Sequence, residues 1–315
     1  KMFGSQDDPD AALNPEALFN LPCKVEKLII QGNTRTKKEL IERELRAALE
    51  ARTHESLALE LGKARRSLED LDVFRSSLFE VDVGSATSDS VNINLHVQEK
   101  GAHTVSTSTS VIGGEGCMEL AWVCRNILGG AEQIRSTVLV GHEQSNALKL
   151  DLVKPYAFDS YNLHLRLFHI GQNFSKTSGY KDLREGLIIS ASQAQSPHLF
   201  SYELCKRSVE AASVTSKEPD ADSSWKSALQ HTFVDDSRDD PLLPSVGRFI
   251  RSAFEITGWF GGRYFWRHQL EGQLHVPVAS RTSLSLFGTL GMLQALSGHK
   301  PFVSDRFFVG GPLSL

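Results

Sequence analysis

The stretch His268-Gln269-Leu270-Glu271-Gly272-Gln273-Leu274-His275-Val276 decides the fold of this chain. The apolar residues in and around it fall on even positions, namely Tyr264, Trp266, Leu270, Leu274, Val276 and Val278. Polar residues take the odd positions, namely Arg267, Gln269, Glu271, Gln273 and His275. Successive side chains of a β-strand point to opposite faces. The stretch therefore predicts a strand with one apolar and one polar face.

The same alternation recurs along most of the chain. Apolar runs such as Leu148/Leu150/Leu152 alternate with polar residues, and so do Met118/Leu120/Trp122 and Tyr161/Leu163/Leu165/Leu167. Between Thr104 and Leu293 the pattern predicts about eleven strands, with roughly 17 residues per strand and turn, whereas soluble sandwiches repeat about every 8–12 residues. Long alternating strands with aromatic residues near their ends are typical of a β-barrel that crosses a lipid bilayer. A soluble sandwich would also alternate and stays an alternative.

The composition excludes several classes of protein. The 315 residues are 40% hydrophobic and carry a net charge of -4, which argues against a disordered chain and against a nucleic-acid partner. Sequence motifs for phosphate binding, for zinc proteases and for serine hydrolases do not occur in the chain. We therefore expect no enzyme activity, no cofactor and no metal site. The four cysteines Cys23, Cys117, Cys124 and Cys205 have no metal-ligand spacing, so we expect unpaired thiols.

A different pattern precedes the alternating region. Residues 1–22 are rich in Asp, Pro, Asn and Ala, and predict a flexible acidic leader. Residues 23–101 predict the order β-α-α-β-β: a strand at 25–31, two helices, and strands at 78–83 and 91–98. Thr36 with Glu39 predicts a capping box at the start of the first helix. This region is a candidate small α+β domain with a three-stranded sheet.

Three segments carry a family resemblance. Val25–Asn33, with two helices that close at Leu71-Asp72-Val73-Phe74, resembles a POTRA domain, the polypeptide-transport-associated module. His231–Gly247 and Asp305–Leu315 resemble two barrel motifs of the POTRA-plus-barrel superfamily of outer-membrane insertases, the bacterial surface antigen type. With one POTRA domain before the barrel, the chain is most similar to the barrel-subunit family of the mitochondrial sorting and assembly machinery.

The resemblance implies a mixed fold. A POTRA domain at 23–101 would be followed by an all-β transmembrane antiparallel β-barrel at 102–315. The family's barrel has sixteen strands, so about five strands, and the Arg-Gly-Phe tip of a loop that enters the lumen, would lie beyond Leu315. We therefore expect this barrel to be incomplete at its C-terminus.

The resemblance also implies a function. The family inserts β-barrel precursor proteins into the mitochondrial outer membrane, with its POTRA domain in the intermembrane space. Expected partners are precursors, accessory subunits of the machinery and membrane lipid. The first barrel strand would form one side of a lateral gate, to which a precursor strand adds by backbone hydrogen bonds. A polypeptide-exporting pore and a soluble β-rich binding protein are the alternatives.

The candidate site residues lie in three places. The lateral-gate strand has few large apolar side chains and consists of Thr104, Val105, Ser106, Thr107, Ser108, Thr109, Ser110, Val111 and Ile112. The hairpin motif contributes Asp236, Arg238, Asp239, Pro244 and Gly247. The loop motif contributes Asp305, Arg306, Phe307, Gly310 and Gly311. A polar rim strand, a solvated loop and an ordinary turn are the respective structural alternatives.

Overall fold

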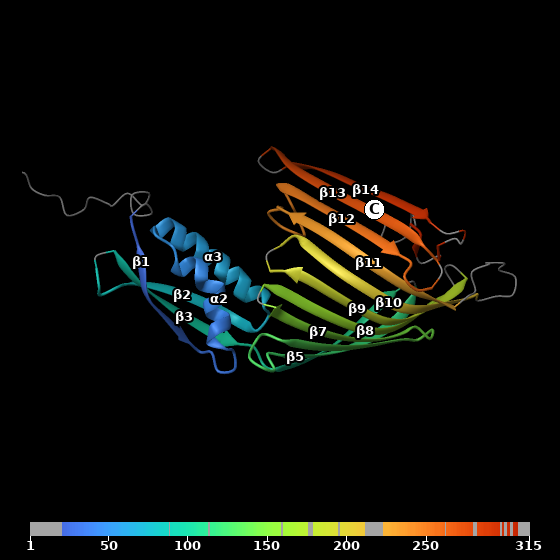
Figure 1. Ribbon diagram of the computed structural model, residues 1–315, viewed down its shortest axis with the longest axis horizontal. Helices are drawn as coiled ribbons and strands as arrows, with labels where there is room; N and C mark the ends of the chain where they lie inside the picture. Colours follow the sequence, from blue (N-terminus) through green and yellow to red (C-terminus); the bar gives the residue numbers. More distant parts are fainter. Residues whose placement is uncertain are drawn as a thin grey trace, which may run out of the picture. The chain divides into compact units, whose positions relative to one another are not determined.

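Two helices cover one face of a three-stranded sheet in the first part of the chain (Figure 1). The computed structural model describes residues 21–87, 89–112, 114–158, 160–175, 179–194, 196–211, 223–261, 263–279, 282–296, 298, 301–302 and 305–307. Of the predicted leader, only Leu21 and Pro22 lie within them. The first elements are β1 (Lys24–Gln31), α2 (Lys38–Leu49), α3 (His54–Asp70), β2 (Phe74–Val83) and β3 (Ser90–Glu99).

The three-stranded sheet has the order β1-β3-β2, with β1 parallel and β2 antiparallel to β3. Its core is apolar. Helix side chains at helical spacing are buried with those of the central strand, and the set is Leu40, Ile41, Leu45, Leu57, Leu61, Leu68, Ile93, Leu95 and Val97. The predicted order β-α-α-β-β is thus found in the structure.

The helix caps differ from the prediction. Helix α2 begins after Lys37, which makes no side-chain cap bond, so the predicted capping box at Thr36 is wrong. Thr36 instead donates its hydroxyl to Glu99 (2.7 Å). A capping box does occur at α3, where Thr53 and Ser56 bond each other's backbone N–H groups.

The second part of the chain forms one antiparallel sheet of eleven strands, as the periodicity predicted (Figure 1). Each strand pairs with the next along the chain, and the order runs from β14 to β4. The strands are β4 (His103–Ile112), β5 (Glu115–Arg125), β6 (Gln133–Gly141), β7 (Asn146–Phe158), β8 (Tyr161–Phe174), β9 (Tyr180–Gln193), β10 (His198–Ala211), β11 (Ser223–Asp236), β12 (Gly247–Thr257), β13 (Phe265–Ala279) and β14 (Thr282–Ala295). In the described residues β4 and β14 are the two edges of this sheet, which is not closed.

The chain divides into two compact units. One contains the described residues up to Ala102 together with the loop Arg125–Glu132, and the other contains the large sheet. Neither helix in the described part of the chain is long and apolar enough to cross a membrane. The domain boundaries 23–101 and 102–315 stay predictions.

Candidate functional site

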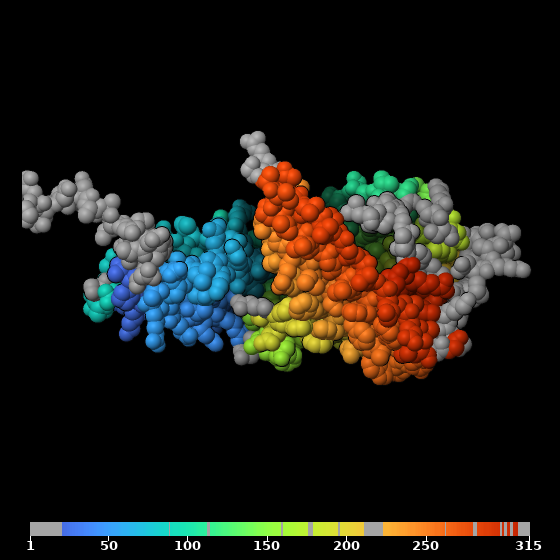
Figure 2. Space-filling model, turned by 90° about the horizontal axis from the view of Figure 1, so that it is seen from above, coloured from blue at the N-terminus to red at the C-terminus, as the bar shows by residue number. Residues whose placement is uncertain are grey.

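The large sheet exposes its apolar face. Many exposed side chains lie at the positions that the alternation assigned to that face, among them Met118, Leu120, Trp122, Leu148, Tyr161, Leu167, Leu270 and Leu274. In Figure 2 the atoms of β13 and β14, orange to red, form a continuous surface. A water-soluble sheet would bury such a face, so this arrangement fits a lipid environment.

The opposite face, which we call the inner face, carries charged groups in contact with one another. Asp151 is 7% exposed and binds His164 (2.8 Å) and Arg166 (2.6 Å). Arg251 binds Glu271 across β12 and β13 (3.2 Å). A buried charge is costly unless it is paired, so these pairs make a polar inner face compatible with folding.

Strand β4 is the first predicted site, and it is exposed on both faces. Its residues from His103 to Val111 are all exposed, and within the described residues it pairs with β5 alone. Arg125 donates its backbone N–H to Ala102 (2.8 Å), and the same register continues with Thr104 opposite Val123 and Ser106 opposite Ala121. In an antiparallel pair, directly bonded residues alternate with non-bonded ones.

This register fixes which backbone groups of β4 point away from β5. Even-numbered residues exchange hydrogen bonds with β5, so Val105, Thr107, Thr109 and Val111 direct their N–H and C=O groups away from it. The strand therefore presents an alternating row of donors and acceptors, which is a template for a further strand.

The hairpin motif forms a braced loop between β11 and β12. Arg238 binds both carboxylate oxygens of Asp236 (2.8 and 2.7 Å) and donates to Gln273 (3.2 Å) on β13. Asp239 accepts the hydroxyl of Ser245 (2.5 Å) and the N–H groups of Ser245 and Val246. These bonds, the one from the Ser245 hydroxyl first, hold the pKa of Asp239 well below its usual value.

Two predicted residues of the hairpin motif have different environments. Gly247 has φ +112°, and a Cβ there would lie 2.3 Å from the backbone oxygen of Ser237. Only glycine fits such a backbone approach. Pro244 is half-buried, while Leu242 and Leu243 beside it are 88% and 84% exposed. The motif is therefore an ordered loop with an exposed apolar tip.

The loop motif contacts a cluster of buried charged side chains on the large sheet. Asp305 is 3% exposed and accepts two hydrogen bonds from Arg207 of β10 (2.8 and 2.7 Å). Lys226 of β11 lies 3.8 Å from the same carboxylate. The backbone oxygen of Asp305 accepts a bond from Arg267 of β13 (3.3 Å). The predicted residue Asp305 is thus held on the inner face of the sheet.

Neighbouring residues complete this cluster. Lys226 also binds Glu203 (2.9 Å) and Glu255 (2.6 Å), and Arg267 binds Glu255 (2.8 Å). We call these six residues, Glu203, Arg207, Lys226, Glu255, Arg267 and Asp305, the interior charge cluster. Of these residues, the alternation in the sequence placed Arg267 on the polar face, but it did not connect Arg267 with the other five.

The other loop-motif residues lie beside Asp305. Arg306 donates from Nε and Nη2 to the backbone oxygen of Pro301 (3.3 and 3.2 Å). The ring of Phe307 lies against Gly291 of β14, where a Cβ would come within 2.8 Å of the ring. Gly310 and Gly311 lie outside the described residues.

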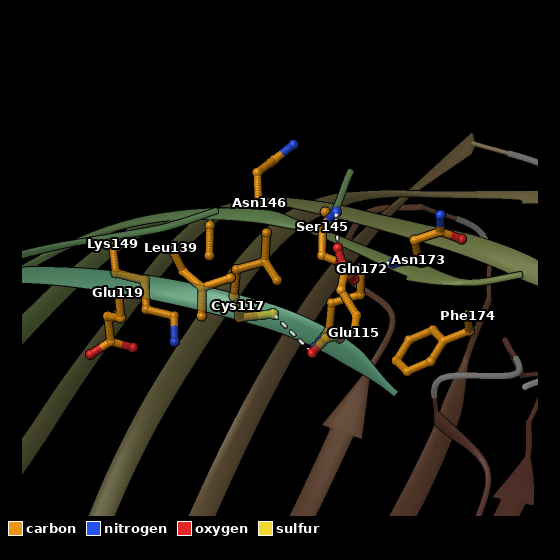
Figure 3. A pocket seen from close by; sticks show the side chains of 13 residues that line it. Glu115, Cys117, Glu119, Leu139, Ser145, Asn146, Lys149, Gln172, Asn173 and Phe174 are labelled. Atoms are coloured by element: carbon orange, nitrogen blue, oxygen red, sulfur yellow. Dashed lines mark hydrogen bonds between the residues drawn. The ribbon is translucent and has the colours of Figure 1, made fainter. Parts of the chain in front are cut away.

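The inner face also contains a cavity of about 220 Å³, lined by residues of β5, β6, β7 and β8 (Figure 3). Glu115 accepts N–H groups of Glu143 (2.5 Å) and Ser145 (3.2 Å) there and so braces the turn between β6 and β7. All four cysteines are free and buried, as predicted. Among the described residues no group of three or more His, Cys, Asp or Glu side chains could hold a metal ion.

An exposed apolar face, a polar inner face and a loop segment bound on that inner face are the features of a membrane β-barrel wall. The model of the Omp85 superfamily domain matches residues 126–315, more than half of the chain, so the chain belongs to the Omp85 superfamily. The family expected from the sequence motifs is therefore confirmed.

Individual relatives agree with this assignment. The chain is 28% identical to the sorting and assembly machinery component 50 homolog of Xenopus tropicalis, over 99% of this chain and 70% of that protein. It is 27% identical to the human homolog, over 98% of this chain and 67% of that protein.

Solved structures show the same fold. A structure of BamA from Haemophilus ducreyi that lacks POTRA domains 1–3 has a TM-score of 0.67 at 15% identity and covers 93% of this chain. CdiB from Escherichia coli has a TM-score of 0.54 at 10% identity and covers 88% of this chain. The chain spans 59% of the BamA chain and 55% of the CdiB chain.

Proposed function

We propose that this protein is an insertase that folds β-barrel precursor proteins into the mitochondrial outer membrane by strand addition at β4. The observation that carries the proposal is the register of β4, in which alternate residues direct backbone donors and acceptors away from β5. The relatives named as components of the sorting and assembly machinery support the same function and membrane.

The chemistry at this edge is backbone pairing. The inner-facing positions Ser106, Ser108 and Ser110 and the outer-facing Thr107 and Thr109 are small, so they offer a precursor little side-chain specificity. A precursor strand that bonds to the edge enters the bilayer with its backbone groups already paired, which avoids several kcal/mol per unpaired group in lipid. Burial of the precursor's apolar face in lipid drives the step, so neither a nucleotide nor a catalytic residue is needed.

The α+β unit has a place in this proposal. Its fold matches the expected POTRA order, and the strands β1 and β2 form the edges of its sheet. In the proposed orientation it lies in the intermembrane space, where it meets precursors and accessory subunits of the machinery. Strand addition at one of its edges would use the same backbone chemistry.

An assay with lipid vesicles tests the proposal. The full-length protein is reconstituted in vesicles, and an unfolded β-barrel precursor is added from outside. We expect the precursor to become resistant to protease and to show heat-modifiable gel mobility within the bilayer, faster than in protein-free vesicles. Precursor delivered to the vesicle interior, with none in the bilayer, would instead identify an exporting pore.

A further inference from the structure

Asp305 differs from the other members of the interior charge cluster in its place in the chain. Glu203 and Arg207 lie on β10, Lys226 on β11, Glu255 on β12 and Arg267 on β13. Asp305 lies after β14, 98 residues from Arg207 in sequence. Its contacts therefore join a loop segment to three strands.

The strands alone leave this cluster with excess positive charge. Arg207, Lys226 and Arg267 are three cations, and Glu203 and Glu255 are two anions. Lys226 bridges the two glutamates and Arg267 binds Glu255, so these four charges satisfy one another. Arg207 is then paired by the carboxylate of Asp305 through both of its oxygens. Asp305 thus gives the cluster a third anion for its three cations, while Asp182, whose charge also acts on Arg207, is paired with Arg184 (3.0 Å).

The surroundings of Arg207 make this pairing strong. The side chains of Arg207 and Asp305 are 3% and 4% exposed, so water screens their attraction little. Nη1 of Arg207 donates to both oxygens of the carboxylate, and hydrogen bonds between charged groups are stronger than those between neutral groups. Phe302 of the same segment is fully buried, and the guanidinium groups of Arg207 and Arg263 lie 4.5 and 4.1 Å from its ring centre. The Asp305 carboxylate and the Phe302 ring thus both hold this segment against the sheet.

We propose that Arg207 and Lys226 form a carboxylate-binding site on the inner face of the sheet, and that Asp305 occupies it as the residue that positions the neighbouring described residues 301–302 and 306–307. The site proposed here lies on strands β10 and β11 and binds an acidic group. It fixes the loop on the part of the sheet remote from the edge strand β4.

This proposal rests on the proposed function in one respect, the role of the fixed loop: it keeps this part of the barrel unchanged while β4 exchanges partners. Its physical content concerns the resting protein. It can therefore be tested without any precursor, and a failure of insertion would leave the site itself standing.

The test is hydrogen exchange of the full-length protein in lipid, followed by mass spectrometry of peptides that contain residues 301–307. Asp305→Ala should speed their exchange at least about tenfold, because the buried guanidinium loses its counter-ion. About 0.1 M acetate should restore much of the protection, and chloride at the same ionic strength should not. Asp305→Asn, which keeps the shape without the charge, should also exchange faster.

A matched control is Glu271→Gln, which removes an ion pair with Arg251 on the same inner face but outside the cluster. It should leave the exchange of residues 301–307 unchanged, and heat-modifiable mobility should show that each variant has folded. Exchange of Asp305→Ala within twofold of the parent would overturn the anchor. Wild-type protection in Asp305→Asn, or fast exchange in Asp305→Ala that acetate does not slow, would show that Asp305 acts by packing and not as a bound carboxylate.

Discussion

Glu99 lies at the end of β3 and accepts hydrogen bonds from three consecutive residues. Its carboxylate receives the N–H groups of Thr34, Arg35 and Thr36 and the hydroxyls of both threonines. Burial alone would raise the pKa of Glu99, but these bonds, those from Thr36 first, outweigh it and lower the pKa to about 2. The carboxylate therefore stabilises the turn between β1 and α2 only while it is ionised.

The pH dependence follows from the sign of this shift. The ionised Glu99 carboxylate contributes its full stability at pH values above 4.5, the pKa in the unfolded state. The contribution is lost as pH falls toward about 2, the pKa in the folded state. Its full size is on the order of 3 kcal/mol, since one pKa unit corresponds to about 1.4 kcal/mol. Protection factors of the Arg35 and Thr36 amides in hydrogen exchange should fall over this pH range. In Glu99→Gln they should be low already at neutral pH and should change little with acid; unchanged protection in that variant would contradict the role.

Gly247 offers a second prediction for a single residue. Valine there would combine φ +112° with a Cβ 2.3 Å from the Ser237 oxygen, so Gly247→Val should destabilise the barrel by about 3 kcal/mol or more. Gly272→Val on β13 is the matched control, because a Cβ there has no neighbour within 4 Å. Heat-modifiable mobility after refolding measures both, and equal assembly of the two variants would be evidence against a bracing role for the loop.

Strands of the large sheet have two chemically different faces, and two neighbouring isoleucines on β9 test them. Ile189 is 48% exposed on the outer face, whereas Ile188 lies opposite Arg166 and Glu203 on the inner face. Ile189→Arg should cost about 2–4 kcal/mol if it lies near the bilayer midplane. Ile188→Arg should cost clearly less, because Glu203 lies beside it. Folding titrations in lipid compare the two, and equal costs would contradict the assignment of faces.

The parity of β4 yields a prediction for the edge. Thr107→Pro removes an N–H group that points away from β5, so the barrel should assemble while precursor insertion falls about tenfold or more. Ser108→Pro removes a bond to β5 and should harm assembly of the protein itself. Thr107→Ala keeps the backbone donor and should insert precursor normally. Normal insertion by Thr107→Pro would mean that precursors do not pair at this edge.

For the whole molecule, the sequence predicted what depends on local periodicity. Alternation predicted the eleven strands and their faces, because burial in lipid and contact with water impose a period of two. Helical spacing and turn residues likewise predicted the α+β unit. Strand β2 begins at Phe74 and not at the predicted Leu78, because pairing with β3 extends it through the polar residues Arg75-Ser76-Ser77.

Contacts between distant residues could not be predicted in this way. Thr36 has the spacing of a helix cap, yet its hydroxyl bonds Glu99, 63 residues away. Arg207 and Asp305 are separated by 98 residues, and neither has a local motif that names the other. The only available signal was a set of charged residues at the alternate positions that face the polar side of neighbouring strands. Such residues must be paired if the inner face is crowded, but the sequence does not say with which partner.

The central claim is that precursors pair with the edge of β4 in one register, and cross-linking tests it most directly. The parent is the full-length protein in which Cys23, Cys117, Cys124 and Cys205 are replaced. Single cysteines are then placed at each position from Val105 to Val111. Each variant is mixed with a stalled precursor that carries a single cysteine in its last strand. We expect each cysteine of β4 to form a disulfide with one position of the precursor strand only. Moving the cysteine by one residue along β4 should move the cross-linked position by one residue along the precursor. Absence of precursor cross-links along β4, under conditions where the same protein inserts precursor into vesicles, would contradict the claim.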